Sequence, residues 1–384
     1  PTLLVLSLSE LIDEVRGSVV QVITNRGLGS GVIIATDDLG AATVLTNHHV
    51  IEEASTIDVV YEEQSTFSAE LLGTDSTRDI AVLRICCNPS FAALKYSNQA
   101  DVKLGESVVA LGFPLGFDSL RVSQGIISGL LFSSSNDRQE IQTDAAINPG
   151  NSGGALVSLD SRLIGVNTAI YSRSGGSIGI GFAIPVNLVR VIVDGLVAGG
   201  KSIRPWLGVL SQTVDHEIGK TLGMEYPRGV IVREIHSASP AGEVGLQIGD
   251  VILSFGGHEI YNPQDLRFRT VTSPLDEKVL VQVFRAGNLE EIRIRVILPP
   301  EKPDRDIRVL YGQTPLSGAA VGNLSPGFAQ EFGLDWTKSG VVVLRVDSGY
   351  AARIGLRKGD IIVGLGDEII FSTKLLNFDT ERVF

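Results

Sequence analysis

Hydrophobic residues along the first half of this chain come in short runs that glycine, asparagine, aspartate and serine interrupt. From residue 18 to about 185, many such short strands separated by turn residues predict a β-barrel or β-sandwich. Examples of these runs are residues 19–23, 31–34, 81–85, 107–111 and 162–166. Two segments have helical spacing instead: residues 8–15, which follow a Ser7–Glu10 capping box, and residues 186–197.

Beyond residue 200 the sequence contains an internal repeat. Residues 229–232 (GVIV) match residues 340–343 (GVVV), and residues 245–252 (GLQIGDVI) match residues 355–362 (GLRKGDII). A period of roughly 110 residues is too long for a solenoid unit and fits two copies of one small domain. Between the copies, the segment PPEKPD at residues 299–304 reads as an extended linker.

We therefore expect three domains, at residues 1–200, 203–299 and 307–384. The first repeat continues through residues 278–298, which we expect to form its last two strands. The second repeat has a helix-like segment at residues 374–379 and reaches residue 384 soon afterwards, so we expect it to be C-terminally incomplete.

Composition narrows the possible functions. The 384 residues are 43% hydrophobic and 20% charged, which suits two or three compact units with sizeable cores. A net charge of −12 argues against nucleic acid as a partner. No apolar run reaches the roughly 18 residues that a membrane span needs. The chain begins at Pro1 without a basic leader region, which indicates a mature or trimmed product: an exported protein whose signal was removed fits, and so does a trimmed chain of any other origin.

The two cysteines, Cys86 and Cys87, are adjacent. A pair of neighbours gives no disulfide framework, and no further ligands lie near enough for a metal site. We expect both to be small, partly buried strand residues.

The strongest local signal for chemistry is Gly-Asn-Ser-Gly-Gly at residues 150–154. Glycines around Ser152 allow a tight backbone path that exposes its hydroxyl and aims successive N–H groups at one point. Alone, such a segment is more often an ordinary turn. A nucleophilic serine also needs a base and an orienting carboxylate.

The candidates for the base and the acid are few. His48 and His49 are the only histidines before residue 200, and Asp79 immediately precedes an apolar strand. Asp75 is a rival carboxylate in the same turn. Spacing alone selects neither between the two histidines nor between the two aspartates.

Three segments in this order make the sequence recognisable. They are TNHHVI at 46–51, DIAVL at 79–83 and QTDAAINPGNSGGAL at 142–156, and GVNTAI at 165–170 and GIGFAIP at 179–185 extend the match. Together they resemble the signature segments of HtrA/Deg serine proteases, over nearly the whole chain. The resemblance implies a mostly β fold: a chymotrypsin-like double β-barrel followed by two PDZ domains.

The resemblance also assigns roles. It implies His49 as the base, Asp79 as the orienting acid and Ser152 as the nucleophile. It implies the N–H groups of Gly150, Asn151 and Ser152 as oxyanion donors. The positions that the family uses for its substrate pocket are Ile147, Thr168, Ala169 and Ile170. Aliphatic walls without an acidic residue favour cleavage after small or medium aliphatic residues.

The two repeats resemble the PDZ domains attached to these proteases. Trp206-Leu207-Gly208-Val209 is similar to the first carboxylate-binding loop, and Leu316-Ser317-Gly318-Ala319 is similar to the second. The implied peptide-carboxylate binding residues are Leu207, Gly208, Val209, Ser317, Gly318 and Ala319. A bound peptide would add as a strand to the adjoining sheet edge.

The leading hypothesis is an ATP-independent endopeptidase of misfolded or damaged proteins, whose PDZ domains bind peptide C-termini and regulate activity. No cofactor or metal is expected. The resemblance implies homotrimers or multiples of trimers and an extracytoplasmic location: periplasm first, thylakoid lumen or cell surface otherwise. The alternative is a non-catalytic, chaperone-like peptide-binding scaffold. A lipase or esterase is excluded, since α/β-hydrolases place the triad in the order Ser, Asp/Glu, His.

Overall fold

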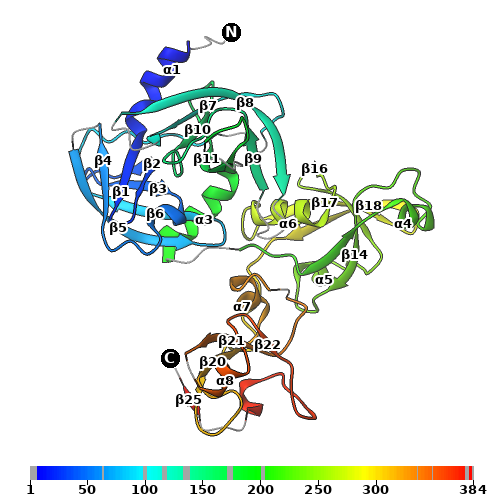
Figure 1. Ribbon diagram of the computed structural model, residues 1–384. Coiled ribbons are helices and arrows are strands. Elements are labelled where there is room, and N and C mark those ends of the chain that lie inside the picture. Colours follow the sequence, from blue (N-terminus) through cyan, green and yellow to red (C-terminus); the bar gives the residue numbers. More distant parts are fainter. Residues whose placement is uncertain are drawn as a thin grey trace. The chain divides into compact units, whose positions relative to one another are not determined.

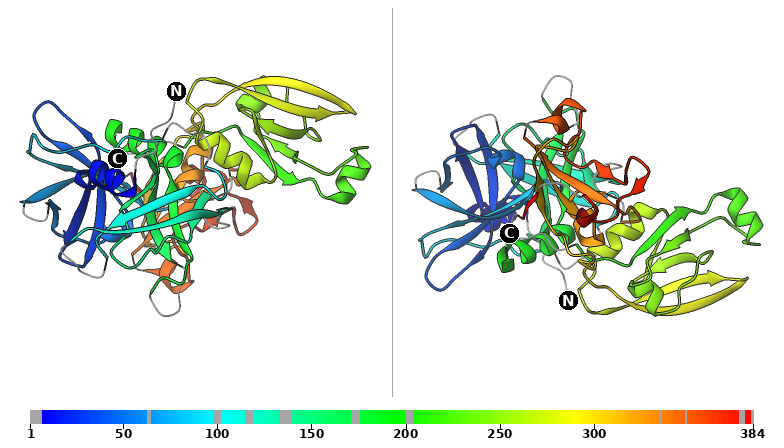
Figure 2. Two further views of the ribbon diagram at one scale, coloured as in Figure 1. Left: turned by 90° about the horizontal axis from the view of Figure 1, so that it is seen from above. Right: turned by 90° about the horizontal axis from the view of Figure 1, so that it is seen from below.

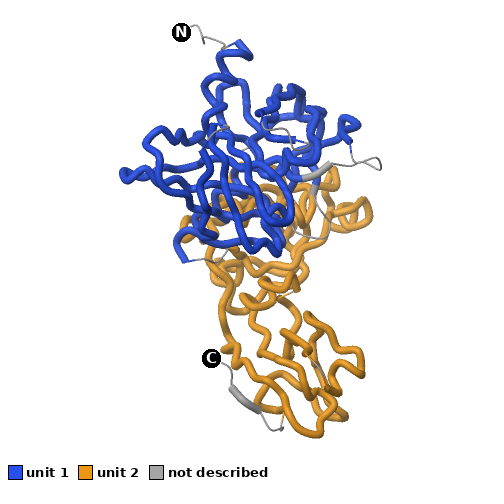
Figure 3. Tube along the Cα trace, turned by 60° about the vertical axis from the view of Figure 1, so that its left-hand side comes forward, with its two compact units in different colours: residues 1–203 blue, residues 204–384 orange. Residues whose placement is uncertain are grey.

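The computed structural model describes most of the chain, which divides into two compact units, residues 1–203 and residues 204–384 (Figure 3). Of residues 132, 169, 170 and 380–382 only the backbone is described. The described residues are 7–62, 65–97, 102–114, 119–132, 139–170, 176–199, 204–334, 336–347, 349–376 and 380–382.

The first unit contains two closed antiparallel barrels of six strands each. The first barrel has the strand order β1-β2-β3-β6-β5-β4 and the second β10-β11-β12-β9-β8-β7. The strands of the first are β1 (Val19–Thr24), β2 (Leu28–Thr36), β3 (Ala42–Thr46), β4 (Ile57–Tyr61), β5 (Ser65–Asp75) and β6 (Ile80–Ile85). Those of the second are β7 (Ser107–Gly112), β8 (Arg121–Phe132), β9 (Gln139–Thr143), β10 (Ala155–Ser158), β11 (Leu163–Ile170) and β12 (Gly181–Pro185).

Each barrel closes around its own apolar core, because alternate side chains of every strand point inward. The blue strands of the first barrel and the cyan and green strands of the second lie side by side in each view (Figures 1 and 2). The first core includes Val20, Val22, Ile33, Val44 and Leu83. The second includes Val108, Ile127, Ile141, Ile147, Leu156 and Ile164.

Short helices begin and end this unit. α1 (Leu8–Val15) starts with the predicted capping box, in which Ser7 and Glu10 each bond the other's backbone N–H, and it leads into the turn η1 (Arg16–Ser18). α2 (His48–Ile51) follows β3 and buries Val50 and Ile51 in the first barrel. α3 (Val186–Gly199) follows β12 and packs against β11, β5 and β6.

The first repeat forms a sheet with the order β13-β14-β15-β17-β18, with β16 paired to β15. β13 is therefore an edge strand, and α6 lies beside it. Residues 278–298 supply the last two strands, as predicted. The elements are β13 (Val209–Thr213), α4 (His216–Thr221), β14 (Val230–Ile235), α5 (Pro240–Glu243), β15 (Val251–Phe255), β16 (His258–Glu259), α6 (Pro263–Val271), β17 (Lys278–Arg285) and β18 (Asn288–Arg295).

The glycine–aspartate turn of the second repeat has the same backbone hydrogen bonds as the corresponding turn of the first repeat. The Gly249 N–H donates to Val232 O at 2.9 Å, and the Gly359 N–H donates to Val343 O at 2.8 Å. Its elements are β19 (Arg308–Leu310), β20 (Ala319–Asn323), α7 (Pro326–Glu331), β21 (Val341–Val346), α8 (Tyr350–Arg353), β22 (Ile361–Ile362), β23 (Gly364–Leu365), β24 (Glu368–Ile369), η3 (Thr373–Leu375) and β25 (Thr380–Arg382).

The second repeat differs from the first at its sheet edges. β20 corresponds to the edge strand β13, yet it is paired on both sides, in the order β22-β21-β20-β19-β25. The helix-like segment predicted at residues 374–379 is described up to residue 376, where it forms only the 3-10 turn η3, and residues 377–379 lie outside the described residues.

The prediction for the cysteines was wrong. Cys86 and Cys87 lie just beyond the end of β6, and both are exposed rather than partly buried in a strand. The apolar run that suggested burial ends one residue earlier, at Ile85, which is 1% exposed.

No helix among the described residues has both the length and the apolar character needed to cross a membrane. The longest helix there, α3, has 14 residues, which is too short to cross a bilayer, and no other described helix qualifies.

Candidate active site

His49 and Asp79 lie together at the mouth of the first barrel. The Nδ1 atom of His49 is 2.9 and 2.8 Å from the two carboxylate oxygens of Asp79. The backbone N–H of His49 also donates to Asp79 Oδ1, at 2.9 Å. α2 anchors the histidine by burying the two residues after it, and the β5–β6 turn presents the aspartate with a left-handed φ of 58°. Aspartate tolerates that conformation better than most residues.

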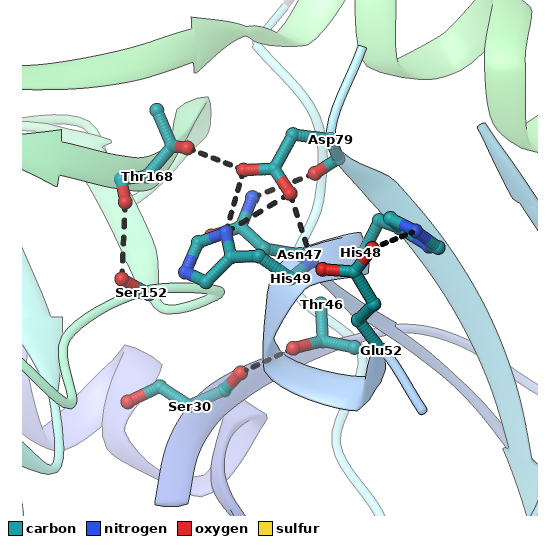
Figure 4. Close-up of polar contacts among 9 residues, drawn as sticks. All are labelled: Ser30, Thr46, Asn47, His48, His49, Glu52, Asp79, Ser152 and Thr168. Atoms are coloured by element: carbon teal, nitrogen blue, oxygen red, sulfur yellow. Dashed lines mark hydrogen bonds and ion pairs between the residues drawn. The ribbon is translucent and has the colours of Figure 1, made fainter. Parts of the chain in front are cut away.

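The same geometry separates the rival residues. His48 faces away from the site, with Nε2 3.8 Å from Glu52 Oε1 (Figure 4). Asp75 is buried within its own turn, where it accepts hydrogen bonds from Thr77 and forms an ion pair of 3.2 Å with Arg78. The ion pairs and hydrogen bonds described for the side chains of these two rivals therefore go to Glu52, Thr77, Arg78 and their own turns, and none of them goes to His49 or Asp79.

Asp79 is held as a carboxylate. Burial alone would raise the pKa of this group, but hydrogen bonds from His49 and Thr168 outweigh burial and lower the pKa below its ordinary value. The Thr168 hydroxyl donates to Asp79 Oδ2 at 2.7 Å, and the Asn47 amide donates to the backbone carbonyl of Asp79 at 2.8 Å. Thr168 lies on β11 of the second barrel, so its bond crosses between the barrels.

Ser152 lies in the turn before β10, on the second barrel. Its hydroxyl donates to the backbone carbonyl of Thr168 at 3.0 Å, and no hydrogen bond joins it to His49 among the described residues. Figure 4 shows the second ring nitrogen of His49 directed away from Asp79, towards the Ser152 side of the site. Rotation about the serine Cα–Cβ bond would move the hydroxyl from one acceptor to the other. Catalytic hydrogen bonds often tighten only when substrate binds.

The turn around Ser152 requires glycine where it approaches the first barrel. Gly153 has a φ of 85°, and a Cβ there would lie 2.1 Å from the Ser30 carbonyl and 2.4 Å from the Thr46 hydroxyl. Any side chain would push the turn away from the first barrel. The glycines that mark this motif in the sequence are therefore needed for close approach as well as for conformation.

The three predicted oxyanion donors are not equivalent. The Asn151 N–H donates to the Asn148 carbonyl at 2.9 Å and is already used. The N–H groups of Gly150 and Ser152 have no protein acceptor among the described residues. Two donors around a serine hydroxyl are what an oxyanion site needs.

The predicted pocket residues fall into three groups. Ile147 is 1% exposed and packs in the core of the second barrel. It fills the space beside Gly181, where a Cβ would lie 2.8 Å from its Cδ1 atom. The Thr168 side chain points at Asp79 rather than into a pocket (Figure 4). The side chains of Ala169 and Ile170 lie outside the described residues.

The two predicted carboxylate-binding loops also differ. In the first repeat, Leu207 is buried, Gly208 has a φ of 71°, and the loop leads into the edge strand β13. In the second repeat, the Gly318 N–H already donates to the Leu310 carbonyl at 2.9 Å. Strand β19 covers the edge of β20 there, so Gly318 is not available to a peptide in this structure, and Ser317 and Ala319 flank an occupied position.

Sequence reasoning missed Ser30 and gave Thr168 a different place. Ser30 is completely buried beside the Ser152 turn, and its hydroxyl donates to the Gly150 carbonyl at 2.6 Å. The sequence carried one local signal, since Ser30 lies between two glycines, Gly29 and Gly31.

The chain matches the models of two domain families. Residues 29–166 match the model of the trypsin-like peptidase domain, and residues 205–296 match that of the PDZ domain. The chain is 39% identical over 356 residues to the probable periplasmic serine endoprotease DegP-like of Pseudomonas fluorescens, covering 91% of this chain and 73% of that protein. It is 39% identical over 347 residues to the protein of the same name from Marinomonas sp., covering 90% and 72%. The solved structure of the HtrA-type protease AlgW with tripeptide aligns with a TM-score of 0.60 at 34% identity, covering 77% of this chain and 98% of that one.

The chain belongs to the HtrA/DegP family of serine endoproteases. This membership and the two six-stranded barrels confirm the predicted chymotrypsin-like fold and serine endopeptidase activity. One PDZ match is found, on the first repeat, so a second PDZ domain is not established by the comparisons. A non-catalytic scaffold gains no support from relatives that are named as endoproteases.

The hydrogen bond from Thr168 to Asp79 predicts a pH effect in this HtrA/DegP protein. Valine in place of Thr168 keeps the side-chain shape but cannot donate, so the pKa of Asp79 will rise. A carboxyl with a depressed folded-state pKa stabilises the fold above its unfolded pKa, and this contribution is lost as pH falls through the folded pKa. We therefore expect Thr168→Val to unfold at a higher pH than the parent during acid titration followed by circular dichroism, both proteins carrying Ser152→Ala.

Thr143→Val is the matched control. Thr143 is also buried, and its hydroxyl donates to the Ile126 carbonyl at 2.8 Å rather than to a carboxylate. We expect it to lower stability without changing the pH dependence. Identical pH dependence in the two variants would contradict the assignment.

Proposed function

We propose that Ser152, His49 and Asp79 hydrolyse peptide bonds by acyl transfer. The observation that carries the proposal is the chain of contacts from the Ser152 hydroxyl through Thr168 to Asp79 and His49, which joins both barrels at one point. Residues from far-apart segments meet there beside two free N–H groups. This arrangement suits a nucleophile, a base and an orienting acid.

The reaction begins when the Ser152 hydroxyl turns from the Thr168 carbonyl towards His49. As its oxygen attacks the peptide carbonyl carbon, His49 Nε2 takes the hydroxyl proton, and the carbonyl oxygen becomes an oxyanion. The Gly150 and Ser152 N–H groups donate to that oxyanion. The carbon–nitrogen bond then breaks, and His49 returns the proton to the leaving amine. Water, deprotonated by His49, hydrolyses the acyl-enzyme in the same way.

Asp79 supports the base throughout this cycle. Its contact with Nδ1 keeps the proton of neutral His49 on that nitrogen, which leaves Nε2 free to accept. The lowered pKa of Asp79 means that it is ionised when His49 becomes an imidazolium, and the negative charge stabilises that cation.

We assign substrates as unfolded or damaged protein chains, without ATP. An extended segment is required to reach a serine in a turn between two barrels. The first repeat would bind peptide C-termini along β13, whose outer edge pairs with no described strand and lies beside α6. The names of the relatives support a periplasmic location. Assembly into trimers or multiples of trimers is part of the same proposal.

Substituting the two neighbouring histidines tests the choice of base. We expect His49→Ala and Ser152→Ala each to lower kcat by about 10⁶-fold, as removal of the base or of the nucleophile from such a triad does. His48→Ala is the matched control and should stay within a few-fold of the parent, because His48 faces Glu52. Digestion of unfolded casein measures all three. An equal loss of kcat in the His49 and His48 variants would contradict the assignment of His49 as the base.

Cleavage preference tests the pocket. Peptide p-nitroanilides that differ only in the residue before the scissile bond should react best with valine, alanine or isoleucine. Arginine there should lower kcat/KM by at least about 100-fold, because its charge would be desolvated and none of the four predicted pocket residues is acidic. Efficient cleavage after arginine would show that the pocket is built differently.

The two glycines of the carboxylate-binding loops test which repeat binds peptide. A Cβ on Gly208 would lie 2.2 Å from Ser239 Cβ, so Gly208→Ala must distort the first loop. We expect at least about 10-fold weaker binding of a fluorescent apolar C-terminal peptide, since loop and strand edge act together. Gly318→Ala, at a φ of 89° in the second loop, is the control and should change affinity less than twofold.

Fluorescence anisotropy on proteins that carry Ser152→Ala measures both affinities without cleavage. Loss of binding in the Gly318 variant alone would place the peptide site on the second repeat.

A further inference from the structure

Ser30 is a buried polar residue that the mechanism above does not use. It lies on β2 of the first barrel, with none of its surface exposed. Its N–H donates to the Ser152 carbonyl at 2.8 Å, and its hydroxyl donates to the Gly150 carbonyl at 2.6 Å. The hydroxyl also accepts from the Phe113 N–H at 2.9 Å, and the Ser30 carbonyl accepts from the Thr46 hydroxyl at 2.7 Å. Every polar group of Ser30 is therefore engaged.

The bond from the Ser30 hydroxyl fixes one peptide plane of the nucleophile turn. The Gly150 carbonyl and the Asn151 N–H belong to the same planar peptide and point in opposite directions. Ser30 holds the carbonyl end, and the Asn148 carbonyl holds the N–H end, at 2.9 Å. This plane lies between the two planes that carry the free N–H groups of Gly150 and Ser152. Its orientation therefore sets where both oxyanion donors point.

The next two planes are held as well. The Gly154 N–H donates to the Asn151 carbonyl at 2.9 Å, which fixes the plane that carries the Ser152 N–H. The Ser30 N–H holds the Ser152 carbonyl, and the Gly153 N–H of that same plane donates to the Asn167 carbonyl at 2.8 Å. Ser30 thus holds two of these three successive planes, one by its side chain and one by its backbone.

Three glycines surround Ser30 closely. A Cβ on Gly153 would lie 2.1 Å from its carbonyl oxygen, one on Gly112 would lie 2.9 Å from its hydroxyl, and one on Gly154 would lie 3.2 Å from its Cβ. The backbone of the Ser152 turn and the end of β7 therefore pack directly against Ser30, with no room for a side chain between them. The Ser30 hydroxyl therefore has little room to rotate towards acceptors other than the Gly150 carbonyl.

Ser30 also connects the nucleophile turn to the segment that carries the base. Thr46, which donates to the Ser30 carbonyl, is the last residue of β3, three residues before His49 (Figure 4). One buried residue of the first barrel therefore contacts both the turn of Ser152 and the strand end that leads to His49.

We propose that Ser30 is a positioning residue for the oxyanion site: its hydroxyl holds the Gly150–Asn151 peptide so that the Gly150 and Ser152 N–H groups face the reacting carbonyl before substrate arrives. This inference rests on the proposed catalytic roles of those residues. Preset donors stabilise the transition state because no reorganisation is needed during the reaction.

Ser30→Ala tests the inference in the full chain. Direct removal of an oxyanion donor lowers kcat by about 10²- to 10³-fold, so loss of the group that orients the donors should lower it by roughly 10- to 100-fold. KM for a valine p-nitroanilide peptide should change less than twofold, because ground-state binding is untouched. The rate of labelling by diisopropyl fluorophosphate, whose phosphoryl oxygen occupies the oxyanion site, should fall by the same factor as kcat.

Ser158→Ala is the matched control. Ser158 is also a buried barrel serine, and its hydroxyl bonds Asp160 and the Arg162 carbonyl in the β10–β11 turn. We expect normal kcat and normal labelling from this variant, even if its thermal stability falls. Ser30→Cys covers the case in which the alanine variant does not fold. Its thiol is a weaker donor of similar shape, and its kcat should be lower than that of the parent.

The outcomes separate the two proposals. If diisopropyl fluorophosphate does not label Ser152 in the parent protein, or if Ser152→Ala still digests casein, the proposed function fails. If the parent is labelled at Ser152 but the folded Ser30 variants keep kcat and labelling within twofold of it, only the role of Ser30 is overturned. A loss confined to KM would overturn that role as well.

Discussion

The chemistry of this protein depends on the seam between two barrels that fold around separate cores. Ser152 lies on the second barrel, while His49 and Asp79 lie on the first, so a small shift of one barrel would separate them. The seam is held by short hydrogen bonds rather than by apolar area alone: Ser30 N–H to the Ser152 carbonyl, and the Thr168 hydroxyl to Asp79. Displacements near 1 Å are known to cost catalysis heavily. These crossing bonds are therefore the constraint that the rest of the site must satisfy.

Such close approach restricts the residue type on each side of the seam. Besides Gly153, Gly29 of the first barrel has no room for a side chain, since a Cβ there would lie 2.6 Å from a methyl group of Val50. Val50 anchors α2, and His49 precedes it, so the space that Gly29 leaves empty lets the base reach its place. Each glycine loses more conformational entropy on folding than another residue would. The cores of both barrels must offset that loss.

The sequence predicted the elements better than the contacts. Runs such as residues 19–23 and 107–111 became strands almost at the expected bounds, because alternation and turn residues act locally. The family resemblance selected His49 over His48 and Asp79 over Asp75. The structure then showed that His49 and Asp79 are in contact. Ser30 and Thr168 could not be placed, since the hydrogen bonds by which they join the two barrels reach Phe113, Ser152 and Asp79, which lie 83 to 122 positions away along the chain. Nothing local encodes contacts of that range.

The second unit shows how two similar sequences acquire different surfaces. Both repeats keep the same glycine–aspartate turn, yet β13 has an edge that pairs with no described strand, whereas β20 is paired on both sides. The covering strand β19 belongs to the same chain and is joined to β20 by a short loop, so its effective concentration at that edge is on the order of millimolar. A free peptide would have to exceed this competition to pair with β20, whereas no described strand competes for the edge of β13. The proposed peptide recognition would thus be biased to the first repeat by covalent connection alone, before any difference in side chains is considered.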